Sequence, residues 1–166
     1  MNDALYEQLV TRKSKPADLI IRIVLIVFLV AVLCVGMLFL GFLAVPITVL
    51  LAFLVYYFIF SRLNVEYEYV LLNHDLEIDA IYNKEKRKKQ ITIDIQQAEI
   101  IAPQNSHRLD SIHAEKTKDF SSGTDSSSVY AIVIPVDQSV TRILIEPDEK
   151  MLDHMSQWMG MKLQRN

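Results

Sequence analysis

Residues 23–60 lack any charged side chain, and this absence indicates that the stretch lies in lipid and not in water. An α-helix rises about 1.5 Å per residue, so one helix of this length would span roughly 57 Å. The hydrocarbon core of a bilayer is only about 30 Å thick. A single straight spanning helix is therefore excluded, and the sequence predicts a hairpin of two transmembrane helices of about 19 residues each.

Cysteine and glycine are also scarce, with one and four residues respectively in a chain of 166. The lone cysteine, Cys34, lies inside the apolar run, so a disulfide framework is excluded. There is no Gly-rich phosphate loop and no Gly-x-Ser-x-Gly nucleophile motif. We therefore expect no cofactor and no catalytic residues, and an enzyme is the least favoured functional class.

Basic residues do not dominate the part of the chain that follows the apolar run. Residues 62–166 hold 13 Lys and Arg against 17 Asp and Glu. An acidic domain is a poor match for the phosphate backbone of a nucleic acid. We therefore expect a membrane or protein partner and no nucleic acid.

The two predicted transmembrane helices are at about residues 19–39 and 43–61. Gly41 lies between them and can adopt the backbone angles of a tight turn. Pro46 falls near the start of the second helix, where its missing N–H costs little. The first segment is far longer than the apolar core of a cleaved signal peptide, so the sequence predicts a retained anchor.

Positive charges flank the run on both sides and are absent from its turn. They are Arg12, Lys13, Lys15, Arg22 and Arg62. Cytoplasmic flanks are the ones enriched in Lys and Arg. The sequence thus predicts a plasma-membrane protein with both termini in the cytoplasm.

Three regions follow from this division. Residues 1–18 form a cytoplasmic N-terminal segment, residues 19–61 the hairpin, and residues 62–166 a soluble cytoplasmic domain. Leu5, Leu9 and Val10 lie among charges in the first region. Their spacing leaves two interpretations open, a short interfacial helix or a frayed tail.

The soluble domain begins with segments that alternate apolar and polar residues, which is typical of half-buried strands. The predicted strands are residues 65–71, 76–82, 89–95, 98–102, 117–120, 129–134 and 141–145. A helix is predicted to open at Pro147, whose fixed φ suits the first helical position, with apolar residues at helical spacing from Met151 to Met159 and a stop at Gly160. The order predicts an α+β domain, a bent antiparallel sheet of about seven strands capped by a C-terminal helix.

This order of elements resembles the pleckstrin-homology-like fold. At the residue level the chain also resembles an uncharacterised family of small two-span proteins from anaerobic Gram-positive bacteria. The stretches that carry this resemblance are Tyr6–Val10, Glu66–Tyr69, Leu76–Asp79, Lys86–Lys88, Asp119–Gly123 and Ile145–Pro147. One departure is the turn Asn73-His74-Asp75, where the family leads us to expect Asn-Gly, so the turn type stays open. The resemblance implies topology and assigns no activity.

One basic cluster stands out, made of Lys84, Lys86, Arg87, Lys88 and Lys89. Next to a membrane, each such cation contributes about 1 kcal/mol of attraction to anionic headgroups. The cluster is therefore a candidate for lipid headgroup contact. The alternatives are a solvated strand end, which is the more common role of such a run, and a specific phosphoinositide pocket.

Other polar groups give weaker signals. None of the histidines His74, His107, His113 and His154 shows a metal-binding spacing, so we expect no metal site. His107, Asp110 and His113 share a face only if their loop is helical. Residues 121–128 are rich in Ser and include Gly123, which is typical of a flexible turn.

These observations favour a non-enzymatic module that is anchored in the membrane. The module presents a pleckstrin-homology-like domain to a protein partner or to the inner leaflet. An accessory subunit of a larger membrane complex is the alternative, and a membrane enzyme ranks below both.

Overall fold

The computed structural model describes residues 5–13, 16–60, 64–123 and 128–165. The chain divides into two compact units. One consists of Met1–Lys13 together with Glu66–Asn166, and the other of Ser14–Val65. We refer to them as the sheet unit and the helical unit.

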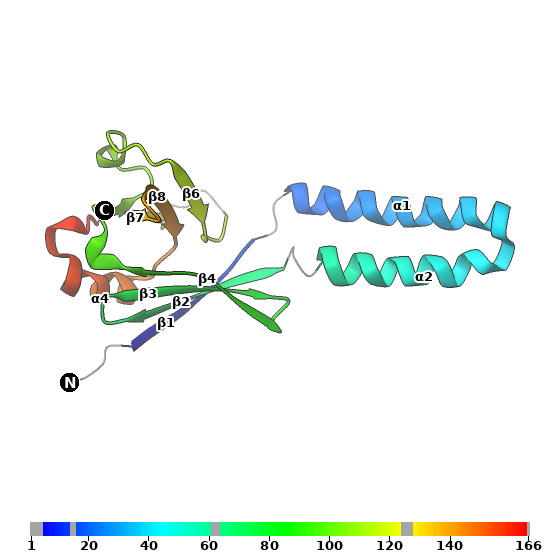
Figure 1. The fold of residues 1–166 in the computed structure, drawn as a ribbon, viewed down its shortest axis with the longest axis horizontal. Coiled ribbons are helices and arrows are strands. Elements are labelled where there is room, and N and C mark those ends of the chain that lie inside the picture. Colours follow the sequence, from blue (N-terminus) through cyan, green and yellow to red (C-terminus); the bar gives the residue numbers. More distant parts are fainter. Residues whose placement is uncertain (1–4, 14–15, 61–63, 124–127, 166) are drawn as a thin grey trace. The chain divides into compact units, whose positions relative to one another are not determined.

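The helical unit contains two helices joined by a short 3-10 segment (Figure 1). Its elements are α1 (Pro16–Leu40), η1 (Gly41–Leu43), α2 (Ala44–Val55) and the π-helical η2 (Tyr56–Phe60). Gly41 has φ +58°, the left-handed conformation predicted for the turn. A Cβ atom on Gly36 would lie 2.9 Å from the Cβ of Ala44, so α1 and the start of α2 approach closely there.

Large apolar side chains cover the helical unit on all sides and are exposed. Leu38 and Phe39 are each 84% exposed, and Phe42 is 81% exposed. The helical stretch Ala17–Ile59 is long and apolar enough to cross a membrane, by length and composition. The ends of the unit also meet, because Arg22 Nη2 donates a hydrogen bond of 3.0 Å to Asn64 Oδ1.

The first sheet of the sheet unit has the order β1-β2-β3-β4. Its strands are β1 (Leu5–Thr11), β2 (Val65–Leu72), β3 (Asp75–Tyr82) and β4 (Lys86–Asp94). The connection between β2 and β3 has positive φ (55°) at Asn73 and not at His74. This answers the open question about the turn, because an Asn-Gly type I′ turn needs positive φ at both residues.

Strand β1 corrects the prediction for the N-terminal segment. Residues Leu5–Thr11 pair antiparallel with β2, so they form neither an interfacial helix nor a tail, and they belong to the sheet unit. Burial along β1 alternates, with Tyr6, Gln8 and Val10 less exposed than their neighbours. The sequence does not reveal this alternation between buried and exposed residues, because the apolar Leu5 and Leu9 lie on the exposed side and are 54% and 61% exposed.

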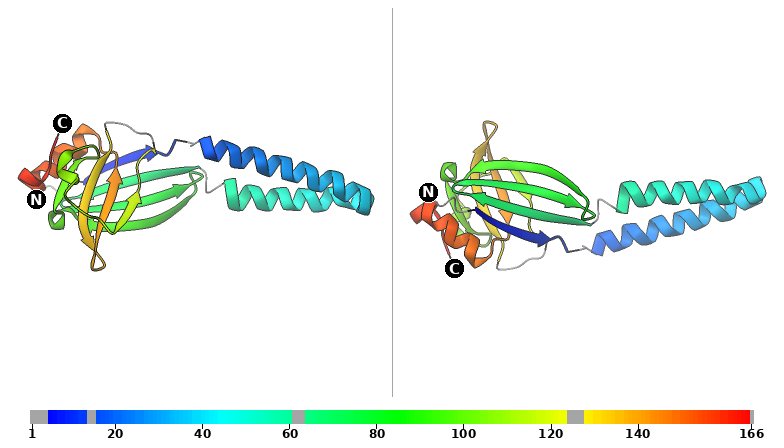
Figure 2. Two further views of the ribbon diagram at one scale, coloured as in Figure 1. Left: turned by 90° about the horizontal axis from the view of Figure 1, so that it is seen from above. Right: turned by 90° about the horizontal axis from the view of Figure 1, so that it is seen from below.

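The second sheet has the order β5-β7-β8-β6. Its strands are β5 (Ile100–Pro103), β6 (Lys116–Asp119), β7 (Tyr130–Val136) and β8 (Ser139–Ile145). Strand β6 pairs parallel with β8, which corrects the prediction of a wholly antiparallel sheet. The described residues thus form eight strands in two sheets, and Figure 2 shows the second sheet crossing the first.

Helix α4 (Glu149–Met159) confirms the predicted C-terminal helix. Asp148 caps it by accepting a hydrogen bond of 2.8 Å from Met151 N, so Pro147 precedes the cap instead of opening the helix. Short 3-10 segments complete the unit: η3 (Ile95–Gln97), η4 (His107–Leu109) and η5 (Gly160–Lys162).

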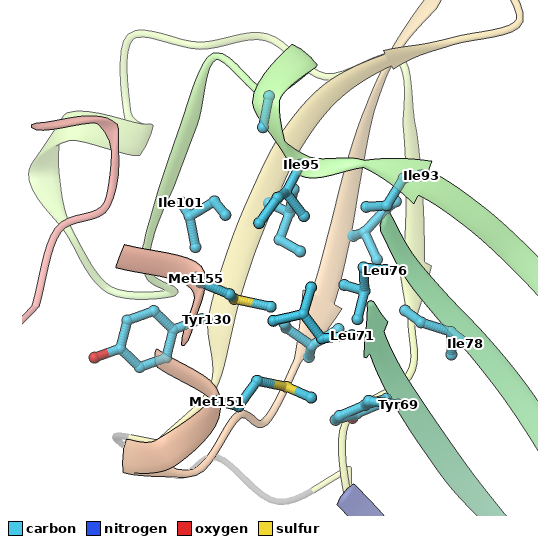
Figure 3. Close-up of a cluster of buried hydrophobic side chains, with 14 of the residues drawn as sticks. Tyr69, Leu71, Leu76, Ile78, Ile93, Ile95, Ile101, Tyr130, Met151 and Met155 are labelled. Atoms are coloured by element: carbon cyan, nitrogen blue, oxygen red, sulfur yellow. The ribbon is translucent and has the colours of Figure 1, made fainter. Parts of the chain in front are cut away.

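The main core lies between the two sheets and α4 (Figure 3). Tyr69, Leu71 and Ile78 of the first sheet enter it, as do Met151 and Met155 of α4, all fully buried. A smaller apolar cluster covers the other face of the second sheet, around Leu109 and Val133. Four apolar residues of α4 therefore pack in the core, namely Met151, Leu152, Met155 and Met159, whereas Trp158 is 39% exposed.

Candidate functional site

The five residues of the predicted basic cluster lie in one turn and one strand. Lys84 sits in the turn between β3 and β4, and the other four open β4. Both Asn83 (φ 52°) and Lys84 (φ 60°) adopt the left-handed conformation, as a tight hairpin turn requires. The cluster is therefore one continuous segment at the start of β4.

A β-bulge then interrupts β4. Ile78 lies opposite Ile91, whereas Asp79 lies opposite Lys89, so Gln90 is the extra residue. The extra residue shifts the alternation of β4 by one position. Lys89 and Arg87 would share the core-facing side of Ile91 in a regular strand, and the bulge places them on the other face.

The bulge divides the basic segment between two faces of the sheet. Side chains alternate along a strand, and Lys89 shares the face of Asp79. Arg87 therefore lies on the outer face with Lys89, whereas Lys86 and Lys88 lie on the opposite face. The cluster does not form one positive surface.

On the outer face, acidic residues of β2 and β3 accompany the cations. Arg87 Nη2 lies 2.6 Å from Glu68 Oε2 and 2.9 Å from Glu68 Oε1, and its Nε lies 3.9 Å from Asp79 Oδ2. Lys89 Nζ lies 2.8 Å from Glu77 Oε2. The carboxylates of Glu68 and Asp79 are nearly buried, whereas Arg87 is half-exposed. Arg87 therefore covers two buried carboxylates and compensates their charge.

The lysine in the turn between β3 and β4 also lies near an acidic residue of β2. Lys84 Nζ is 3.9 Å from Glu66 Oε1. Lys84, Arg87 and Lys89 thus face carboxylates of their own sheet, which lowers the positive potential available to an anionic surface. Lipid headgroup contact by these five residues stays a prediction.

A second polar cluster joins β1 to the segment before α4. Gln8 Nε2 donates to the carbonyl of Glu146 (2.9 Å), and Gln8 Oε1 accepts from Asp148 N (3.0 Å). The Tyr6 hydroxyl donates to Asp148 Oδ2, and this hydrogen bond raises the pKa of Tyr6. The ring of Tyr6 also lies 5.3 Å from that of His154. These contacts hold β1 against the C-terminal helix.

Glu146 extends this cluster to the serine-rich loop. Its carboxylate accepts from Ser122 N (3.1 Å) and from Ser128 Oγ (2.8 Å), while Ser122 O accepts from Lys13 N (2.8 Å). Three of the stretches that carry the family resemblance, Tyr6–Val10, Asp119–Gly123 and Ile145–Pro147, therefore meet here. Sequence reasoning noted them separately and had no signal for their meeting.

The first part of that loop is ordered by its own side chains. Asp119 Oδ1 accepts from Ser121 N (3.0 Å) and Ser121 Oγ (2.7 Å), and Ser121 Oγ accepts from Gly123 N (3.2 Å). Ser121 and Ser122 are buried. The prediction of a flexible turn is therefore wrong for residues 121–123, and residues 124–127 lie outside the described part.

Tyr69 connects the core to this loop. Its hydroxyl donates to Phe120 O (2.5 Å) and accepts from Glu146 N (3.3 Å). Burial raises the pKa of Tyr69. The phenol thus satisfies two backbone groups inside the domain and stays neutral.

At the turn between β2 and β3, the structure brings together three side chains that sequence spacing did not connect. His74 Nδ1 lies 3.0 Å from Asp94 Oδ1 and 3.5 Å from Asp75 Oδ1. The ring of Trp158 from α4 packs edge-on against His74, with centroids 5.6 Å apart. His74 and Asp94 lie 20 residues apart in sequence, so only the register of β3 and β4 reveals this cluster.

The other histidines stay separate from it. His107 Nδ1 lies 3.3 Å from the Oδ2 atom of Asp110, the residue that directly follows η4, and both side chains are exposed. This is the local helical face that the sequence proposes for His107 and Asp110. His113 follows η4 in an irregular segment.

The profile of a bacterial PH-like domain family, DUF6106, matches residues 2–165. The chain belongs to this family. The matched residues include β1 and the helical unit as well as the rest of the sheet unit. No curated protein and no solved structure matches the chain.

Proposed function

We propose that this DUF6106 protein is a non-enzymatic binding module anchored in the plasma membrane. In this proposal α1 and α2 cross the bilayer as a hairpin, both termini are cytoplasmic, and the PH-like domain binds a protein partner. The observation that carries the proposal is the exposed apolar surface around the whole helical unit. Water would not tolerate so large a contiguous apolar surface, whereas lipid would.

Helix length supports insertion. The 25 residues of α1 extend about 37 Å, and the 17 residues from Ala44 to Phe60 extend about 25 Å. These values bracket the roughly 30 Å of a hydrocarbon core. Arg12, Lys13 and Arg22 flank the helices on the proposed cytoplasmic side and no cation flanks η1, which supports the orientation.

The charge pattern of the domain favours a protein partner over anionic lipid. A headgroup surface needs cations that are free of local carboxylates, whereas Arg87 and Lys89 are paired on the outer face. The same face carries exposed Leu5, Leu9 and Leu72 at its β1–β2 side. Protein interfaces have an apolar centre with a polar rim, and these exposed leucines next to paired charges fit that pattern.

Topology is tested with single-cysteine labelling. In a Cys34→Ser background, Phe42→Cys places a thiol in the turn and Lys150→Cys places one on the domain. A membrane-impermeant maleimide added to intact cells is expected to label position 42 and to leave position 150 unlabelled until the cells are opened. Labelling of position 150 in intact cells would overturn the proposed orientation, and loss of the protein from alkali-washed membranes would overturn anchoring.

The partner is tested by crosslinking in native membranes with the full chain. We expect a protein crosslink that is lost in the double variant Leu5→Glu, Leu9→Glu and kept in Lys86→Ala, Lys88→Ala. The reverse result, together with salt-sensitive binding of the full chain to anionic vesicles, would replace the protein partner with the inner leaflet. Co-purification with other membrane spans that survives the Leu5 and Leu9 changes would instead support the accessory-subunit alternative.

A further inference from the structure

The cluster of His74, Asp75 and Asp94 has the dimensions of a metal-coordination site. One ligand atom from each residue lies within 4.8 Å of the other two. Ligands at about 2.0–2.2 Å from a tetrahedral ion are about 3.3–3.6 Å apart. The separations of 3.0 Å and 3.5 Å from His74 Nδ1 to the two carboxylates require shifts of only a few tenths of an ångström.

The backbone places two negative charges face to face at this position. Asp75 and Asp94 are direct partners in the antiparallel pair of β3 and β4. Like charges directly opposite each other destabilise a sheet. Within the described ranges, neither carboxylate pairs with a lysine or arginine, and the imidazole of His74 is the one group they share. A bound cation would compensate both charges.

The donor set selects the kind of cation. One imidazole nitrogen and two carboxylate oxygens suit zinc and related first-row ions. Calcium prefers six to eight oxygen ligands, and magnesium retains several waters and uses oxygen ligands. We propose that His74, Asp75 and Asp94 bind one divalent transition-metal ion of the zinc class, with water completing its coordination.

Backbone contacts hold two of the three ligands in place. Asp94 Oδ1 accepts from Gln96 N (2.9 Å) and so caps η3, while the carbonyl of His74 accepts from Ile95 N (2.9 Å). The turn that carries His74 and the strand end that carries Asp94 are therefore fixed to each other. A site with positioned ligands loses less conformational entropy when the ion binds.

The chain provides a reporter for this site. Trp158 is its single tryptophan and contacts the His74 ring. The experiment uses the full-length protein in mild detergent, without a polyhistidine tag and treated with chelator. Co²⁺ is titrated while Trp158 fluorescence is followed, and Zn²⁺ binding is measured by calorimetry.

We expect one Zn²⁺ per chain and quenching of Trp158 by Co²⁺ that Zn²⁺ reverses. His74→Gln, Asp75→Asn and Asp94→Asn are each expected to weaken binding at least about tenfold, since even losing a partner of a metal ligand typically costs 10–100-fold. Asn remains a good N-cap, so Asp94→Asn keeps η3 capped. Asp75 is 58% exposed, so Asp75→Asn removes a ligand with little effect on packing.

The pair His107→Gln and Asp110→Asn is the matched control, because these residues form an exposed His–Asp contact of 3.3 Å elsewhere. Both control variants are expected to bind Zn²⁺ with unchanged affinity. Absence of stoichiometric Zn²⁺ binding would overturn the proposal. So would equal affinity of the wild type and Asp75→Asn, or Co²⁺ quenching that persists in His74→Gln.

Discussion

Thr11 lies directly opposite Glu66 in the antiparallel pair of β1 and β2. Between them the chain runs through the entire helical unit. The helices therefore occupy the position of a hairpin loop, inserted between two neighbouring strands of one sheet. This arrangement makes the N-terminal residues an integral part of the PH-like domain. A soluble fragment of the domain must therefore include β1.

The first prediction concerns the boundary of the soluble domain. A fragment of residues 62–166 lacks β1 and is expected to be at least about 3 kcal/mol less stable than a chain that joins residues 1–13 to 66–166 through a short Gly-Asn linker. Burial of Val10 contributes about 1.5–3 kcal/mol, and each lost hydrogen bond from Gln8 costs about 1 kcal/mol. Urea unfolding followed by circular dichroism measures the difference.

The linked chain also serves as the control for that comparison, because it lacks the helical unit as the fragment does. Equal stability of the two proteins would show that β1 is not part of the cooperative unit. Val10→Ala in the linked chain is expected to lose part of the same free energy.

The second prediction separates two ion pairs on one face. Arg87→Ala leaves the nearly buried carboxylates of Glu68 and Asp79 without their cation. Because Arg87 is half-exposed and solvent screens the pair, we expect a loss of about 1–2 kcal/mol in the free energy of unfolding. Lys89→Ala breaks an exposed pair with Glu77 and is expected to change stability by less than about 0.5 kcal/mol. Thermal unfolding of the two variants side by side tests this, and equal losses would contradict it.

The third prediction concerns the approach of the two helices at Gly36. Its Cβ position lies 2.9 Å from the Cβ of Ala44, so Gly36→Val must separate α1 from α2. We expect a lower midpoint of thermal unfolding for the helical unit in detergent. Val35→Leu changes an exposed neighbouring position and is the control. An unchanged midpoint in Gly36→Val would show that this contact is not maintained.

Much of this fold follows from alternation that is visible in the sequence. Alternation predicts β2, β3, the end of β4 and β8. Strands β5 and β7 are short apolar runs that are buried without alternation, and β6 contains no apolar residue. Helix α4 follows from apolar residues at helical spacing. Strand β1 was missed because Leu5 and Leu9 face away from the core while Gln8 faces inward. The division into two sheets and the parallel pairing of β6 depend on contacts distant in sequence, which no local period reports.

The candidate site shows the same limit. The sequence identified the basic segment but could not give its bulge, since Gln90 follows the alternation like any other residue. Alternation in β2 did place Glu66 and Glu68 on the face opposite Tyr67 and Tyr69. That alternation is sufficient to predict acids on one face of the sheet that also contains the basic strand. The contact between His74 and Asp94 can be predicted only from the full register of β3 and β4.

The last prediction uses the buried phenol of Tyr69. Tyr69→Phe leaves Phe120 O and Glu146 N without their partner, which costs about 1–3 kcal/mol at neutral pH. Burial raises the pKa of Tyr69 in the folded protein above the ordinary value of about 10. Above pH 10 the unfolded chain therefore releases this proton first, and the free energy of unfolding falls as pH rises. Below pH 10 the contribution is complete.

The variant is expected to lose stability less steeply than the wild type above pH 10, because it has no phenol to ionise at this position. Lysine side chains titrate in the same range in both proteins, so the difference between the two curves isolates Tyr69. Urea unfolding from pH 7 to 11 measures it. Parallel curves would show that the hydroxyl ionises as readily in the folded chain as in the unfolded one, contrary to its burial and its hydrogen bond to Phe120.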